Sequence, residues 1–232
     1  MRRKSIYIFF ISLLFCSSIW AQEEAITDSL KVKDQKYGLR VGTDLIKLGR
    51  TLFEDGYTGF EVQGDFRVTK KWFAALELGT DDREWDKDEL VAIAKGSYFK
   101  LGADFNAYEN WEGMNNSIFV GLRYGFATFS QELVEYRVYT TDTTFPTEIV
   151  QSGETIDGLT ASWAELMIGV KTEIWSNLYL GLNVQLRHLV SEKTPDNFDN
   201  LLIPGFNRTY DSSDWGVGYG YTISYLIPVF KK

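Results

Sequence analysis

A hydrolase needs a nucleophile and a base within hydrogen-bond reach of each other, and this chain offers a single histidine to serve as the base. That histidine is His188, and Ser191 follows it three residues later. Both lie in or beside a stretch that alternates like a β-strand, where side chains three positions apart point to opposite faces. They cannot form a nucleophile–base pair locally. The sequence therefore predicts that the protein is not an enzyme, and the role expected for His188 is that of an interfacial ring.

Acidic residues gather in two segments that could bind a cation. The first segment holds Asp81, Asp82, Glu84, Asp86, Asp88 and Glu89, and the second holds Asp196, Asp199, Asp211 and Asp214. Carboxylate oxygens at this density could hold calcium, but neither segment has the spacing and turn glycine of a calcium-binding loop. Because runs of charge are usually solvated, we expect these segments to form a solvated surface. No metal and no cofactor are predicted.

The first residues have the pattern of a cleaved secretory signal. Residues 2–4 are basic, Ile6–Phe15 is an apolar run, and Ala21 is a small residue at the end of a plausible cleavage region. The apolar run is too short for a membrane helix, which needs about 20 apolar residues. A membrane anchor is therefore the lesser alternative, and the sequence predicts a signal peptide over residues 1–21.

Removal of this leader would change the cysteine content and the charge. Cys16 is the chain's one cysteine, so the mature chain would have no disulfide. Lipidation of Cys16 is a minor alternative, because Phe15 and not a small residue precedes it. Loss of the three basic residues takes Lys+Arg from 24 to 21 against 32 Asp+Glu, and the net charge from −8 to −11. Such acidity argues against nucleic acid as a partner.

The rest of the chain alternates apolar and polar residues with the period of β-strands, after a polar segment over residues 22–36 that we expect to be a flexible periplasmic stretch. The eight alternating stretches are Tyr37–Leu45, Tyr57–Val68, Trp72–Thr80, Ser97–Ala107, Ser117–Phe129, Ala161–Ile174, Leu178–His188 and Trp215–Ile227. Short and long connections alternate between them, as in bacterial outer-membrane barrels. The sequence predicts an all-β fold, a closed antiparallel up-and-down transmembrane β-barrel of eight strands over residues 37–230.

One face of these stretches is apolar, and the other combines glycine with charged residues. A soluble lipocalin-like barrel would turn its apolar face inward. Eight strands, however, enclose an interior only just wide enough to be filled by side chains, and the bulky residues of this face would not fit. We therefore expect the apolar face to meet lipid and the glycine-rich face to line a closed lumen of paired charges. The predicted lumen network consists of Arg40, Asp65, Arg67, Lys100, Asp104, Arg123, Glu165, Lys171 and Arg187.

Aromatic residues near the predicted strand ends support this orientation. Tyr and Trp favour the two interfaces of a membrane, where a ring can be apolar on one side and wet on the other. The predicted interfacial girdle consists of Tyr37, Trp72, Trp163, Trp175, Trp215, Tyr219 and Tyr225. The alternative is that these aromatic residues are scattered through a soluble core.

With these features the chain resembles the small eight-stranded bacterial outer-membrane barrels, and in particular uncharacterised exported barrel families catalogued only as domains of unknown function. The resemblance covers nearly all of the mature chain and rests on the pattern of alternation. It implies an aromatic end to the last strand that the assembly machinery reads, and Tyr221, Tyr225 and Phe230 resemble such an end. The chain departs from that pattern because Pro228 interrupts the last strand and two lysines follow Phe230.

Two classes of function follow from this prediction. We favour a non-enzymatic scaffold or interaction protein of the outer membrane that contacts lipid through its outer face. An accessory subunit of an envelope assembly or transport complex is one form that such a protein would take. Envelope protein partners would bind its long loops or its periplasmic rim, and the threonine-rich loop over residues 131–158 is the expected contact element. The alternatives are a small pore and a lipid-modifying enzyme of the outer membrane.

Overall fold

The computed structural model describes residues 36–87, 90–108, 115–138, 149–195, 199–209 and 212–231. All of them fall within the compact unit Asp34–Lys232. The predicted signal peptide over residues 1–21 lies outside the described residues, as does the predicted flexible segment except for its last residue, Lys36.

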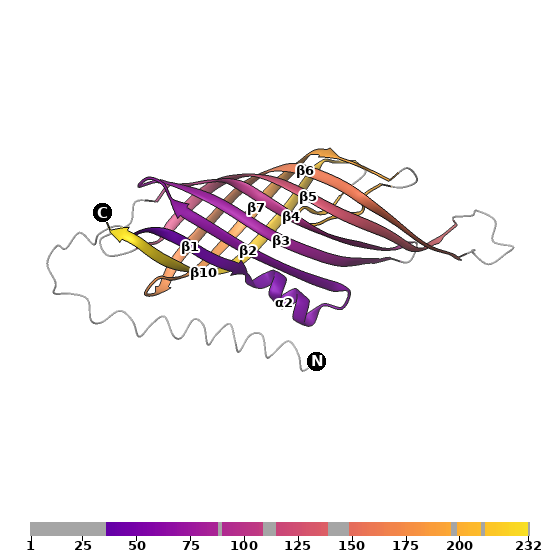
Figure 1. Ribbon diagram of the computed structural model, residues 1–232, viewed down its shortest axis with the longest axis horizontal. Helices are drawn as coiled ribbons and strands as arrows, with labels where there is room; N and C mark the ends of the chain where they lie inside the picture. The colour runs from indigo at the N-terminus through magenta and orange to yellow at the C-terminus, as the bar shows by residue number, and fades with distance from the viewer. Residues whose placement is uncertain are drawn as a thin grey trace. The chain divides into compact units, whose positions relative to one another are not determined.

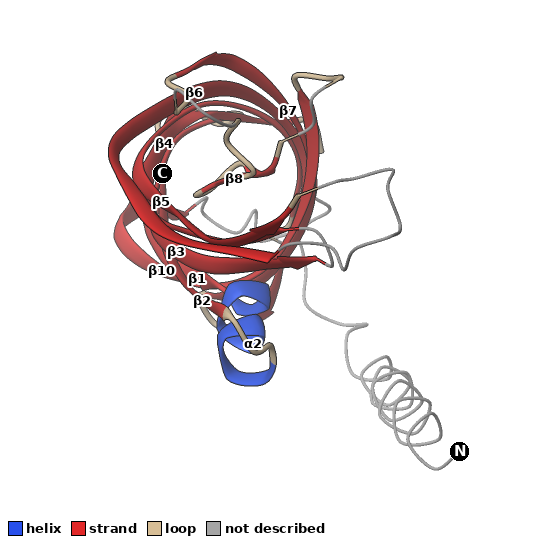
Figure 2. Ribbon diagram, turned by 90° about the vertical axis from the view of Figure 1, so that its right-hand side faces the viewer, coloured by secondary structure: helices blue, strands red, loops and turns tan. Residues whose placement is uncertain are grey.

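Eight long strands form a ring in which each strand is antiparallel to its neighbours, and the last strand closes the ring on the first. The strands are β1 (Lys36–Asp44), β2 (Tyr57–Arg67), β3 (Trp72–Lys87), β4 (Leu90–Asn106), β5 (Ser117–Arg137), β6 (Ile149–Trp175), β7 (Leu178–Glu192) and β10 (Trp215–Lys231). Figure 2 looks along this ring and shows its closed outline. The predicted eight-stranded up-and-down barrel is confirmed. In the described ranges, no helix is long and apolar enough to cross a membrane.

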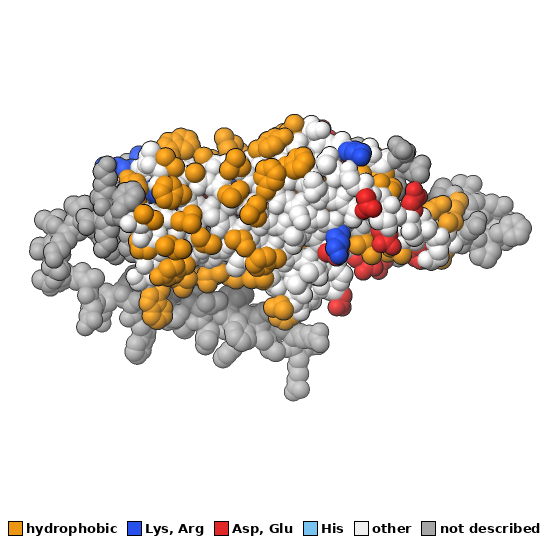
Figure 3. Space-filling view, viewed as in Figure 1, with side chains coloured by type: hydrophobic (Ala, Val, Ile, Leu, Met, Phe, Trp, Pro, Cys, Tyr) orange, Lys and Arg blue, Asp and Glu red, His pale blue; other side chains and the backbone are white. Residues whose placement is uncertain are grey.

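Alternation along the strands sorts the side chains between the two faces of the barrel wall. Leu101, Leu122 and Val184 are exposed on the outside, whereas Lys100 and Arg123 are buried inside. Figure 3 shows apolar side chains spread over the left-hand part of the barrel surface, acidic ones toward the right-hand end and basic ones at both ends. Because the polar face is inside and the apolar face outside, the predicted orientation of the wall is confirmed.

Four strands extend at least seven residues farther than predicted at one end, which corrects the lengths of two expected loops. Strands β3 and β4 stay paired as far as Lys87 and Leu90, whereas the third strand was predicted to end near Thr80. β5 and β6 likewise stay paired as far as Arg137 and Ile149. The backbone hydrogen bonds of a paired ladder outweigh the weak strand preference of acidic and polar residues. Figure 1 shows these strands running on beyond the others at one end of the barrel.

A short helix, α2 (Leu45–Phe53), follows β1 where the sequence analysis expected strand and loop. The side chain of Asp44 caps the helix by accepting hydrogen bonds from the backbone N–H groups of Ile46 and Lys47, at 2.7 and 3.2 Å. The helix packs against β2 and β10. Its polar residues Lys47 and Thr51 contact the barrel, whereas Leu52 and Phe53 are 75% and 89% exposed. A helix whose apolar side turns away from the protein fits a surface in contact with lipid.

The connection from β7 to β10 folds into the mouth of the barrel. It contains the two-stranded hairpin of β8 (Leu202–Ile203) and β9 (Asn207–Arg208), and Figure 2 shows β8 inside the ring of strands. Phe206 between them is buried against Trp163, with the ring centres 5.9 Å apart. Gly205 has a φ of 78°, and a side chain there would collide with the ring of Tyr98. The hairpin therefore closes the end of the lumen beside the extended strands.

Candidate functional site

An unbroken chain of ion pairs crosses the lumen, with positive and negative groups in strict alternation. It runs through Arg40, Asp65, Lys171, Asp104, Arg123, Glu77, Lys100, Glu165 and Arg187. The shortest contact joins Arg123 to Asp104 at 2.7 Å, and the longest joins Lys100 to Glu165 at 3.7 Å. Ionised groups inside a protein persist when each has opposite charges and hydrogen bonds around it. The lumen is thus filled by paired side chains.

Lys100 lies at the centre of this network and is only 1% exposed. Its ammonium group lies 2.8 Å from Glu77, 3.7 Å from Glu165 and 3.8 Å from Glu61. Three carboxylates around one ammonium leave an excess of negative charge, which Arg123 and Arg187 offset by pairing with Glu77 and Glu165. Removing any one of these charges would leave its partners buried without compensation.

The structure brings eight of the nine predicted lumen residues into the ion-pair chain, and Arg67 lies apart from it. Arg67 is half-buried, with its guanidinium 5.0 Å from the ring centre of Phe73 and 5.5 Å from that of Tyr37. The sequence analysis missed Glu61 and Glu77 as members of the network. Glu61 shares the inward face of β2 with the predicted member Asp65, and Glu77 shares the inward face of β3 with the buried Ala75, so strict alternation was the signal that could have identified them.

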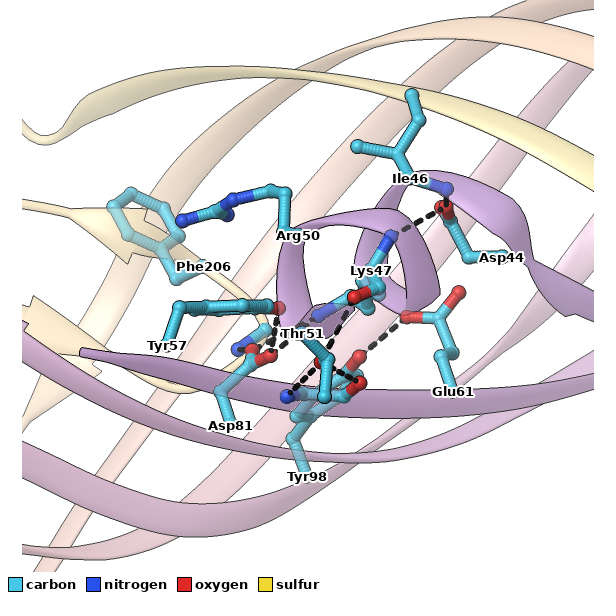
Figure 4. A network of polar contacts seen from close by, with 12 residues as sticks. Asp44, Ile46, Lys47, Arg50, Thr51, Tyr57, Glu61, Asp81, Tyr98 and Phe206 are labelled. Carbon is cyan, nitrogen blue, oxygen red and sulfur yellow. Dashed lines mark hydrogen bonds and ion pairs between the residues drawn. The ribbon is translucent and has the colours of Figure 1, made fainter. Parts of the chain in front are cut away.

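A second polar cluster joins α2 to the inside of the barrel (Figure 4). Lys47 of α2 forms an ion pair with Asp81 of β3 at 2.8 Å, and the Tyr57 hydroxyl donates to the same carboxylate at 2.7 Å. That carboxylate also accepts a hydrogen bond of 2.9 Å from the backbone N–H of Gly205. Asp81 therefore connects the helix, the barrel wall and the hairpin in the mouth. The sequence analysis placed Asp81 in a solvated acidic loop, and that prediction is wrong because the residue is buried.

The remaining contacts of α2 hold it against β2. The hydroxyl of Thr51 accepts a hydrogen bond of 2.8 Å from the backbone N–H of Gly59. Arg50 stacks over the ring of Tyr57 at 3.8 Å and forms an ion pair with Glu54 at 2.6 Å. The hydrogen bonds that Arg50 donates lower the pKa of the Glu54 carboxyl below its usual range.

A polar cavity of about 350 Å³ lies between α2, the barrel wall and the hairpin in the mouth. Its lining comes from β1, α2, β2, β3, β4, β7, β9 and β10 and includes Arg50, Arg83, Lys100, Arg187 and Tyr219. Cavities of this size accommodate a small ligand or a head group. The described residues contain no group of three or more His, Cys, Asp and Glu side chains that could hold a metal ion.

The predicted aromatic girdle divides into exposed and buried members. Trp72, Trp175, Trp215, Tyr219 and Tyr225 are exposed on the outside of the barrel.

Two predicted girdle members are buried, and for them the prediction is wrong. Trp163 is 0% exposed and packs inside against Tyr98 and Phe206, because it shares the inward face of β6 with Glu165. Tyr37 is 8% exposed and lies at a register shift between β1 and β10, where Phe230 pairs with Tyr37 and Pro228 with Gly38.

His188 lies on the outer face of β7, and its ring is 4.6 Å from that of Trp215 in an edge-on contact. Ser191 pairs with Ser162 farther along the same strand. The structure therefore gives His188 an aromatic neighbour and does not bring it together with Ser191 as a nucleophile–base pair.

The threonine-rich contact element expected over residues 131–158 is mostly strand. Residues 131–137 belong to β5 and residues 149–158 to β6, and residues 139–148 between them lie outside the described residues. Tyr136, Val138 and Ile149 expose apolar side chains near the end of this hairpin. In its described part the expected loop is thus a pair of strands, which expose apolar side chains on either side of residues 139–148.

Comparisons with known proteins match the chain to one protein family and to solved structures. The family model described as Domain of unknown function (DUF6048) matches residues 1–232. No curated protein matches the chain. The chain is similar to the crystal structure of Ail, the attachment invasion locus protein of Yersinia pestis, with 9% identity, a TM-score of 0.38, and 83% of this chain and 98% of that chain covered. It is also similar to the crystal structure of Acinetobacter baumannii CarO2, with 11% identity, a TM-score of 0.38, and 84% and 100% covered.

Proposed function

The chain belongs to the family described as Domain of unknown function (DUF6048), and on this premise we propose that it is a non-enzymatic integral barrel of the outer membrane that serves as a docking platform for another envelope protein. The apolar outer face anchors it in lipid. The extended strands β3 to β6 carry the docking surface beyond the membrane.

The observation that carries the proposal is the described end of the β5–β6 hairpin, residues 136–138 and 149, which is called the hairpin tip below. Tyr136, Val138 and Ile149 are exposed there, beyond a segment that also carries exposed polar residues such as Gln151 and Glu154. Large apolar side chains gathered at the end of a protruding hairpin are costly to leave in water and commonly mark a protein contact. The filled lumen and the closed mouth favour such a surface role over transport through the barrel.

Capture from detergent-solubilised membranes tests this proposal. A tagged full-length chain should retain one partner in stoichiometric amount. A variant in which Tyr136 and Val138 are both replaced by Asp should lose that partner, while its heat-modifiable gel mobility stays that of a folded barrel.

The matched control carries two Asp substitutions on exposed polar residues away from the hairpin, Ser212 and Ser213. It should keep the partner. Recovery of the barrel alone from the wild type, or equal recovery of the partner with both variants, would contradict docking at the hairpin tip.

A further inference from the structure

The wall of the barrel is incomplete on one side, because β1 stops short of its neighbours. β1 pairs with β2 only from Leu39 to Thr43, and with β10 only as far as Asp44 and Thr222. β2 continues to Tyr57 and β10 to Trp215, each still paired on its other side. In this half of the barrel α2 occupies the place that a longer β1 would fill.

The helix closes this gap unevenly. Toward β2 it is held by the hydrogen bond from Gly59 to Thr51 and by the stacking of Arg50 on Tyr57. Toward β10, the described residues show no hydrogen bond from α2, and the polar cavity extends to this side, where Val217, Gly218 and Tyr219 line it. The seam between α2 and β10 is therefore the weakly closed side.

The cavity passes through the wall at this seam. Gly218 lies on the inward face of β10 and lines the cavity together with Lys100 and Arg187 of the lumen. Val217 and Tyr219 line it too, although their side chains point outward and are 75% and 72% exposed. A cavity lined by both faces of one strand opens around that strand's edge. It connects the polar interior with the apolar outer surface.

One cation in the cavity is left over after the others are paired. Lys47 pairs with Asp81, Arg50 with Glu54, and Arg187 with Glu165. The guanidinium of Arg83 is half-buried in the lining, and within the described part of the chain it makes no ion pair or hydrogen bond.

The carboxylates of the cavity already have donors. Asp44 caps α2, and Glu61 accepts from Tyr98. A free guanidinium fork is suited to the oxygens of a phosphate or a carboxylate.

We propose that the seam between α2 and β10 binds an anionic amphiphile, with its phosphate or carboxylate head on Arg83 and its acyl chains outside along Val217, Tyr219 and the apolar face of α2. A cavity of about 350 Å³ holds a head group but not the acyl chains of a lipid. The chains must then lie on the outer surface, where the seam opens. This inference concerns the barrel wall and does not depend on docking at the hairpin tip.

Binding of a short-chain phosphatidic acid to the full chain in a nonionic detergent tests the proposal, measured by native mass spectrometry and titration. The wild type should bind it saturably and more tightly than the phosphatidylcholine analogue. Arg83→Gln should weaken binding about tenfold, the expected effect of losing one charge-assisted hydrogen bond. Arg83→Lys, which keeps the charge but loses the fork, should fall between the two.

Two further variants separate the head group from the chains. Tyr219→Ala should weaken binding of phosphatidic acid and leave binding of inorganic phosphate unchanged, because the ring contacts only the acyl part. Lys95→Gln, which removes an exposed cation elsewhere on the barrel, should change neither.

Several results would overturn the proposal. Inorganic phosphate that binds as tightly as phosphatidic acid would show a site for a free anion only. Equal binding of the phosphatidylcholine analogue, or an Arg83→Gln variant that is folded by gel mobility and binds normally, would show that Arg83 does not select the ligand. A peptide found on the wild-type protein in place of lipid would show that the open edge of β10 pairs with a partner strand.

Discussion

At the scale of single residues, Lys100 holds together the most crowded part of the lumen. Replacing it with Met removes the ammonium from between Glu61, Glu77 and Glu165, so we expect a loss of ~3–5 kcal/mol in the free energy of unfolding, the usual effect of breaking a buried ion pair. Urea titration of the barrel refolded into lipid vesicles measures this loss.

The matched control for that measurement is Lys95→Met. Lys95 lies on the same strand but is exposed, with Asp82 3.4 Å away, and exposed pairs contribute about 0–1 kcal/mol. Equal stability of the two variants would mean that the lumen network does not stabilise the fold.

The indole ring of Trp163 packs against Gly125. A Cβ at this position would lie 2.2 Å from the indole ring, so Gly125→Ala should overpack the lumen and cost ~1–3 kcal/mol. Gly64→Ala is the control, because the nearest atom to its added Cβ is 3.8 Å away. Denaturant titration of both variants checks the difference, and a Gly125→Ala barrel as stable as Gly64→Ala would contradict it.

Strict alternation along the strands predicted which residues enter the lumen, but the aromatic residues were interpreted by type and not by position. Glu165 and Trp163 lie two residues apart on β6 and therefore share a face. Glu165 was predicted to lie inside the barrel and Trp163 outside, although two residues that share a face of a strand must lie on the same side of the wall. Tyr37 could not have been placed in this way, because it lies at a register shift that arises only when β1 pairs with β10.

At the scale of elements, Thr51 connects α2 to the free edge of β2. Thr51→Val removes the hydroxyl that accepts from Gly59, a contribution of about 1 kcal/mol. Hydrogen–deuterium exchange of the α2 amides should become roughly fivefold faster, because the helix opens more often. Thr58→Val, at an exposed position on β2, should leave the exchange of α2 unchanged. Unchanged exchange in both variants would mean that other contacts hold the helix.

The helix itself was predictable in part. Asp44 is a good N-cap residue, and the nine residues after it separate into one apolar and one polar side at helical spacing. The alternating residues before Asp44 hid this change of period, since Leu45 also fits the end of a strand. The long extensions of β3 and β4 were less visible, because acidic residues such as Asp86 are depleted in strands and are held there by pairing with their neighbours.

At the scale of the whole molecule, the barrel should not conduct ions. The ion-pair chain and the β8–β9 hairpin both fill the lumen, so planar-bilayer recordings of the wild type should show only background conductance. A variant with residues 202–208 replaced by a short glycine linker should stay closed as well, because the network around Lys100 and Arg123 remains. Steady conductance in the wild type would revive the alternative of a small pore.

The sequence predicted the number of strands, their antiparallel order and which face of the wall points into the lumen. A two-residue period and the size of an eight-stranded interior leave few other arrangements. The gap beside β10 did not follow, because it depends on where β1 ends relative to β2 and β10. Such a stagger arises from register, which a single chain does not display until its strands are paired.

The shortness of β1 also bears on the order in which the ring forms. Neighbouring strands such as β3 and β4 are joined by a short connection, whereas β1 and β10 lie at opposite ends of the sequence that forms the barrel. Joining distant positions is slow, because the intervening chain loses entropy first. We therefore expect the pairing of β1 with β10 to be the last step. Until this pairing occurs, the folding barrel is an open sheet with two unpaired edge strands. Those edge strands are where an assembly factor would bind.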